Sequence, residues 1–196
     1  TIRQEMNLLA TEFPESIAYD ISLDSTTAID AGIRDIVVTL IVALILVVFV
    51  VFIFIQDWRA TLIPTLAIPV SLIGAFIFFP ALGFTINVLS LLGLVLAIGI
   101  VVDDAIVVVE AVQVNIAKGM STKEATLDAM RKVTAPVIAT TLVLVAVFIP
   151  VAGMAGITGL LYQQFAITIV VSVLVSSVNA LTLSPALCSL LLKEPK

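Results

Sequence analysis

The sequence predicts an all-α membrane protein, a bundle of five transmembrane helices with a short extracytoplasmic strand-containing N-terminal segment. Of its 196 residues, 61% are hydrophobic and only 12% are charged, whereas a soluble domain usually carries about 25% charged residues. The apolar residues also gather into runs close to the ~20 residues that a helix needs to cross a ~30 Å hydrocarbon core. The expected helices span about 31–55, 62–79, 88–110, 134–150 and 164–184.

The composition excludes several classes of function. A net charge of −5 argues against nucleic-acid binding. The chain has no histidine and a single cysteine, Cys188, so it cannot build a histidine switch, a cysteine cluster or an internal disulfide. We therefore expect no metal, no cofactor and no catalytic residue, and the lipid bilayer is the partner that the composition requires.

The first 30 residues differ from the rest of the chain. Residues 1–13 carry apolar side chains at helical spacing, and Pro14 ends this pattern. Residues 17–24 then alternate apolar and polar side chains, which is the pattern of a half-buried strand. A single strand is not stable alone in water. Since the chain also begins with Thr1 instead of Met, we interpret it as an internal piece of a larger protein.

Residues 31–187 form the predicted transmembrane bundle. The first helix, 31–55, is followed by a polar stretch that includes Trp58, a residue suited to the membrane interface. The second helix, 62–79, has Pro64 and Pro69 in its first turns, where a missing N–H is best tolerated.

The third helix, 88–110, contains the only acidic pair within an apolar run. The polar segment 111–133 is expected to form a cytoplasmic amphipathic helix, and the fourth helix follows over 134–150. A glycine-rich turn leads into the fifth helix, 164–184, and residues 188–196 form a tail.

The distribution of basic residues predicts the orientation. Along the chain, connections that carry lysine or arginine alternate with connections that carry neither, as expected for five successive membrane crossings. The connections 80–87 and 150–164 contain no lysine or arginine, so they are expected on the outer side together with the N-terminal segment. The tail is then cytoplasmic. The basic residues on the cytoplasmic side are Arg59, Lys118, Lys123, Arg131, Lys132, Lys193 and Lys196.

Asp103 and Asp104 lie side by side in the third run, with uninterrupted apolar residues on both sides. An ionisable residue inside the membrane costs several kcal/mol unless it is paired or protonated, so it indicates a functional site. Adjacent helix residues point about 100° apart. Gly93, Ala97 and Asp104 share one face and Gly99 and Asp103 another, so small residues let neighbouring helices approach both carboxylates.

Two adjacent carboxylates cannot both stay ionised in a low dielectric without a positive partner. None of the five apolar runs, the first of which extends from Ile36 to Ile55, contains lysine or arginine, so we expect the counter-ion to come from outside this chain. A carboxyl group in this position can carry a proton, because protonation removes its charge and lets helices repack. The alternative is a static ion pair that holds helices together, although buried charge stabilises structures poorly.

Other polar residues near the pair are candidates for a proton path. Glu110 lies at the cytoplasmic end of the third helix, where it can extend towards water. Ser176 and Asn179 lie in the fifth run and are either part of this path or interhelical hydrogen-bonding residues.

The motif DDAIVVVE lies inside a predicted membrane helix. Five further motifs are QDWRATLIPTLAIPVSLIGAF, GFTINVLSLLGLVLAIGIV, STKEAT, FIPVAGMAGITGLLYQQFAITI and LTLSPALCSLLLK. Together these motifs resemble those of the resistance-nodulation-division (RND) efflux pumps, most closely their hydrophobe/amphiphile multidrug branch. The resemblance extends over almost the whole chain, and DDAIVVVE is its most specific motif.

The resemblance implies a proton-driven multidrug antiporter and not an enzyme. By this likeness the chain holds the second to sixth of twelve membrane helices, and residues 1–30 end a periplasmic porter subdomain. Asp103 and Asp104 match the family's proton-relay pair, whose lysine, arginine and threonine partners lie in the second half of the pump. Ala111 stands where the family usually has asparagine, which leaves that cytoplasmic contact in doubt.

The resemblance also implies partners: protons, amphiphilic drugs bound by the porter domain, a homotrimer, a periplasmic adaptor protein and an outer-membrane channel. It places the chain in the bacterial inner membrane as a multi-pass protein. A structural or assembly subunit, in which the acid pair joins helices, is the alternative. An intramembrane aspartyl protease would need a second Asp on another apolar run, and there is none.

Overall fold

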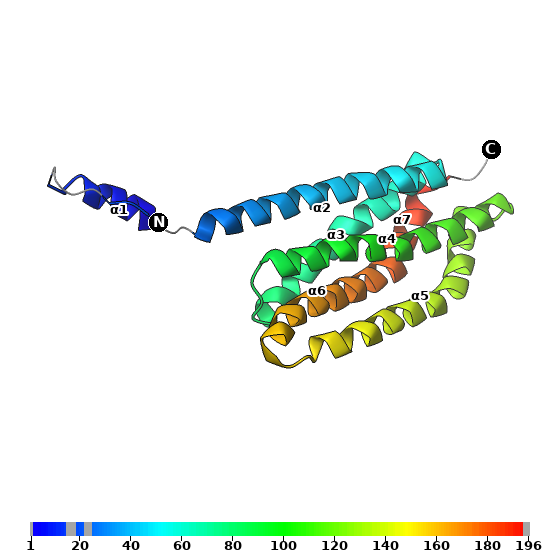
Figure 1. Ribbon diagram of the computed structural model, residues 1–196. Coiled ribbons are helices and arrows are strands. Elements are labelled where there is room, and N and C mark those ends of the chain that lie inside the picture. The colour runs from blue at the N-terminus through cyan, green and yellow to red at the C-terminus, as the bar shows by residue number, and fades with distance from the viewer. Residues whose placement is uncertain (1, 15–18, 22–24, 194–196) are drawn as a thin grey trace.

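The computed structural model describes residues 2–14, 19–21 and 25–193, and the regular structure in these residues is helical. A short helix precedes a bundle of long ones (Figure 1). The helices are α1 (Ile2–Ala10), α2 (Ser25–Ile55), α3 (Trp58–Ala81), α4 (Val88–Ala117), α5 (Thr122–Ala152), α6 (Gly156–Leu181) and α7 (Leu183–Leu191).

Five helical segments are long and apolar enough to cross a membrane, and α6 with α7 counts as one of them. This confirms the predicted all-α membrane fold with five spans. Most of the predicted strand at 17–24 lies outside the described residues, and the described part, 19–21, has no regular structure.

The long helices run back and forth, so that successive helices are antiparallel (Figure 1). α4 and α6 are central: α4 contacts α2, α3, α5, α6 and α7, and α6 contacts α3, α4, α5 and α7. The turns α2–α3 and α4–α5 lie at the same end of the bundle as α7, and the turns α3–α4 and α5–α6 lie at the other end. α1 stands apart from the bundle and makes no contact with the other described helices.

The apolar core has two parts that follow these helices. Leu72, Leu94 and Ile98 belong to the part between α2, α3 and α4. The second part, nearer α7, includes Val109 and the fully buried Cys188. Cys188 is thus a packing residue of this part of the core.

Several helix ends differ from the predicted ones: α2 begins at Ser25 and not near 31, α3 begins at Trp58 and not near 62, and α7 extends the helical structure to Leu191. The predicted amphipathic segment 111–133 is divided between the end of α4 and the start of α5, with Gly119 in the turn at φ +89°.

α6 begins at Gly156 and not near 164. The glycines at 153, 156 and 159 had predicted that the turn before this helix continues to about residue 164. In the structure, a Cβ at Gly159 would lie 1.9 Å from the Met154 carbonyl oxygen, so glycine is what lets the first turn of α6 fold against the preceding chain.

Asn87 caps α4. Its side chain accepts a hydrogen bond from the Ser90 N–H at 3.0 Å, and the Ser90 hydroxyl accepts from the Asn87 N–H at 3.0 Å. The Asn87 side-chain amide also donates to the Gln164 side chain of α6. The start of α4 is therefore fixed to α6, which also contacts Asp104 further along α4.

We expect Gly159→Ala to lower the stability of the intact protein by about 1–3 kcal/mol, because the added methyl group must displace the Met154 backbone. The measurement is the thermal unfolding midpoint in detergent. Gly153→Ala is the matched control, since a Cβ there meets its nearest atoms at 3.7 Å. Equal midpoints for the two variants would contradict this account of the turn.

Candidate functional site

Asp104 lies on the side of α4 that faces α6. The Ser176 hydroxyl of α6 is 3.1 Å from Asp104 Oδ2 and also 3.1 Å from the Val101 carbonyl oxygen, and it can donate to either. Ser176 is buried and Asp104 is half-buried. The structure thus brings two of the predicted site residues together, from positions 72 residues apart in the chain.

Small residues of α4 allow this approach. A Cβ at Gly93 would lie 3.1 Å from the Phe165 carbonyl oxygen and 3.3 Å from the Thr168 side chain, both on α6. Ala97, one turn further on, is fully buried. Gly93, Ala97 and Asp104 therefore lie on the α4 face that meets α6, where small side chains let helix backbones come close.

Asp103 and Gly99 lie on a different face of α4, which the described helices of this chain leave uncovered. Both residues are exposed, and a Cβ at Gly99 would find no neighbour within 4 Å. Among the described residues, Asp103 has no hydrogen-bond or ion-pair partner. The other helices of this chain cover the remaining sides of α4, so neither Gly99 nor Asp103 packs against a described helix.

This uncovered surface is continuous along α4. We call it the open face of α4 and define it by its exposed residues: Leu96, Gly99, Asp103, Val107 and Glu110. Glu110 follows Asp103 by seven residues, about 10 Å along the axis. The two acidic side chains of the open face are therefore aligned, two turns apart.

Glu110 also lines a crevice of about 310 Å³ between α4 and α5. Lys118 and Lys132 line the same crevice. Close to it, the Asn115 amide donates to Asp128 Oδ2 at 3.0 Å, which ties the two helices together. Lys118 follows Asp103 by 15 residues, so it lies about 22 Å further along α4, too far to pair with that carboxylate.

Asn179 does not join the acidic pair. Its amide donates to the Ser71 hydroxyl of α3 at 2.9 Å. Asn179 lies one turn after Ser176 on α6, so α6 bonds to α4 through one residue and to α3 through the other. The sequence analysis missed Ser71. Ser71 is a hydroxyl residue within an apolar run, and this position could have predicted a hydrogen bond to another helix. It is fully buried in the structure.

These observations define a multi-pass membrane protein with two acidic side chains inside one span, one hydrogen-bonded to a neighbouring helix and one on an open face. The sequence model of the AcrB/AcrD/AcrF family matches residues 1–196, and the chain belongs to this family. This confirms the resemblance to RND multidrug transporters that the motifs indicated.

Three relatives show how far the similarity extends. The chain is 45% identical over 193 residues to multidrug resistance protein MdtF of Escherichia coli K12. It is 44% identical over 192 residues to multidrug resistance protein MdtC of Pectobacterium atrosepticum, and 44% identical over 193 residues to an uncharacterized transporter of Haemophilus influenzae. In each case the match covers 98% of this chain but 19% of the relative. The chain thus spans about a fifth of these proteins.

A double-mutant cycle tests the contact between α4 and α6. We expect Asp104→Ala and Ser176→Ala to be coupled by about 1–2 kcal/mol in the free energy of unfolding, because a hydrogen bond joins the two side chains. The same cycle with Ser172→Ala is the control, since the Ser172 hydroxyl donates to the Thr168 carbonyl of its own helix. Coupling that is no larger with Ser176 than with Ser172 would refute the contact.

Proposed function

We propose that this chain is part of the membrane domain of a proton-driven multidrug efflux antiporter of the bacterial inner membrane. Asp103 and Asp104 would carry the protons that drive export. The observation that carries the proposal is the position of Asp104, inside an apolar span and hydrogen-bonded to Ser176 of another helix. Family membership and the names of the relatives support the kind of transport.

The position of Ser176 offers a way to couple protonation to helix contacts. When Asp104 is ionised, its carboxylate only accepts hydrogen bonds, and the Ser176 hydroxyl donates to it. When Asp104 is protonated, it becomes a donor itself. The Ser176 proton is then free to turn to the Val101 carbonyl oxygen, which is equally near at 3.1 Å. Gain of one proton thereby reverses the polarity of the α4–α6 contact.

The counter-ion for the pair would come from the part of the protein that this chain lacks. Asp103 faces outward on the open face of α4, and Gly99 one turn before it leaves room for another helix to approach. A basic side chain on that helix would stabilise the ionised pair and lose its attraction when a proton arrives. The family resemblance points to lysine, arginine and threonine in the second half of the pump for this role.

The other candidate residues fit the proposal to different degrees. Glu110 lies on the same open face as Asp103 and borders the crevice between α4 and α5, and this position supports a role in passing protons towards water. Asn179 bonds to Ser71 of α3 and is better placed to fix helix positions than to conduct protons.

The whole transporter would be a homotrimer that works with a periplasmic adaptor protein and an outer-membrane channel. Amphiphilic drugs would bind in a porter domain outside this chain. These partners follow from the family resemblance. The alternative is a structural or assembly subunit with the acid pair as an interhelical contact, and the Asp104–Ser176 hydrogen bond is compatible with it.

Proton-flux measurements separate the two functions. We expect Asp103→Asn and Asp104→Asn, each made in the intact protein reconstituted in vesicles, to reduce drug-linked proton flux to the level of protein-free vesicles. Neither amide can take up and release a proton. Asp35→Asn is the control, because Asp35 is exposed and lies in the N-terminal half of α2. This variant should retain the flux. Near-normal flux in both site variants would favour the structural role.

Labelling of introduced cysteines tests the proposed topology, in which the α4–α5 turn is cytoplasmic and the α3–α4 turn is periplasmic. Thr85→Cys and Ala117→Cys are exposed positions in these two turns or at their edge. In a protein without other cysteines, a membrane-impermeant maleimide applied to whole cells with a permeabilised outer membrane should label Thr85→Cys and leave Ala117→Cys unlabelled until lysis. The reverse pattern would invert the topology.

A further inference from the structure

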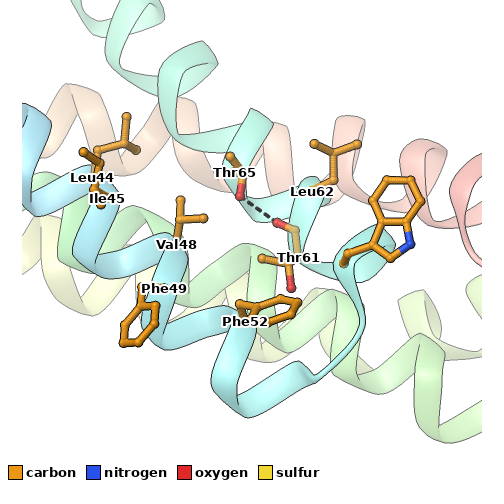
Figure 2. A pocket seen from close by; sticks show the side chains of 9 residues that line it. Leu44, Ile45, Val48, Phe49, Phe52, Thr61, Leu62 and Thr65 are labelled. Carbon is orange, nitrogen blue, oxygen red and sulfur yellow. Dashed lines mark hydrogen bonds between the residues drawn. The ribbon is translucent and has the colours of Figure 1, made fainter.

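A groove runs between the C-terminal half of α2 and the first turns of α3, far along the chain from the acidic pair (Figure 2). Its volume is about 560 Å³. We call it the α2–α3 groove. It is lined by Leu44, Ile45, Val48, Phe49, Phe52, Trp58, Thr61, Leu62 and Thr65.

The groove offers its occupant almost no hydrogen-bonding group. The two hydroxyl groups in its wall are already engaged with the backbone of α3: Thr61 donates to the Asp57 carbonyl and Thr65 to the Thr61 carbonyl, each at 2.8 Å. Phe49 and Phe52 stand along its opposite, α2 side and are 61% and 47% exposed. The occupant that suits such a surface is an apolar chain.

A cation stands at one end of this apolar surface. The Arg59 guanidinium carbon lies 5.2 Å from the centre of the Trp58 ring, and Trp58 lines the groove. Within the described part of the chain, Arg59 has no carboxylate partner. The nearby Asp57 carboxylate accepts the Arg59 backbone N–H at 2.9 Å and serves as the cap of α3. The Arg59 charge therefore remains available at the end of the groove.

The side chains distinguish between a helix and a lipid as occupant. Helices that pack in membranes prefer interfaces of small residues, which allow close backbone approach. The open face of α4, with Gly99 beside Asp103, has this character. In the α2–α3 groove, branched and aromatic side chains surround the two threonines. They suit a flexible acyl chain better than a second helix backbone.

We propose that the α2–α3 groove binds one acyl chain of an anionic phospholipid, with the lipid phosphate held by Arg59. The charges are complementary, and a guanidinium can bind two phosphate oxygens at once. Trp58 belongs to the residue type that prefers the headgroup level, so the headgroup and the chain would meet the protein at matching depths. In the proposed topology, this lipid belongs to the cytoplasmic leaflet.

Native mass spectrometry of the intact protein tests the proposal, with phosphatidylglycerol and phosphatidylcholine of identical chains as probes. The wild type should retain phosphatidylglycerol in preference to phosphatidylcholine. Arg59→Gln should reduce this preference about fivefold, the effect expected of one basic residue near an anionic lipid. Arg34→Gln, an exposed arginine at the far end of α2, is the matched control and should leave the preference unchanged.

A second pair of variants tests the groove itself. Val48→Trp fills the groove and should lower retention of both lipids, whereas Ile53→Trp, on α2 but outside the lining, should not. All variants are compared at matched yield and thermal unfolding midpoint. Equal lipid retention by Arg59→Gln and Arg34→Gln would overturn the proposal, and so would a structure of the intact protein with a helix in the groove. Since no transport is measured, the result is independent of the proton relay.

Discussion

The structure depends on how one carboxyl group is accommodated inside an apolar helix. An ionisable group at this depth is costly unless a neighbour stabilises it, and the neighbour here is a single hydroxyl group, that of Ser176 at 3.1 Å. That distance requires α4 and α6 to lie close together, which Gly93 and Ala97 permit. The small residues two and three turns before Asp104 are thus as necessary to the site as its polar atoms, because a larger side chain there would separate the carboxyl group from its donor.

The two surfaces that this chain leaves uncovered have opposite chemistry. The open face of α4 combines a glycine with two acidic side chains, so it suits another helix that carries positive charge. The α2–α3 groove combines bulky apolar walls with an arginine at one end, so it suits a molecule with a negative head and a flexible apolar tail. The size of the residues and the sign of the nearby charge distinguish the two surfaces.

Much of this could be predicted from the sequence, because much of it depends on local properties. Run lengths predicted the five spans, and the spacing of Gly93, Ala97 and Asp104 predicted their common face. The partner of Asp104 could not be chosen between Ser176 and Asn179, since a turn of α6 by less than 100° would exchange their environments. That rotation is set by packing over the whole helix. The start of α6 was predicted too late in the chain. Gly159 was interpreted as a loop residue, whereas it lies inside the helix and allows close contact with the Met154 backbone.

One feature of α6 has a mechanical consequence. Ser176 reaches α4 and Asn179 reaches α3, and the two residues are separated by only about 4.5 Å along the helix axis. One helical turn is too short to bend between these two residues. If α6 slid or rotated, the Asn179–Ser71 hydrogen bond would have to move with it or break. If protonation of Asp104 shifts α6, the Asn179–Ser71 hydrogen bond would carry that shift to α3, the helix whose first turns form one wall of the α2–α3 groove.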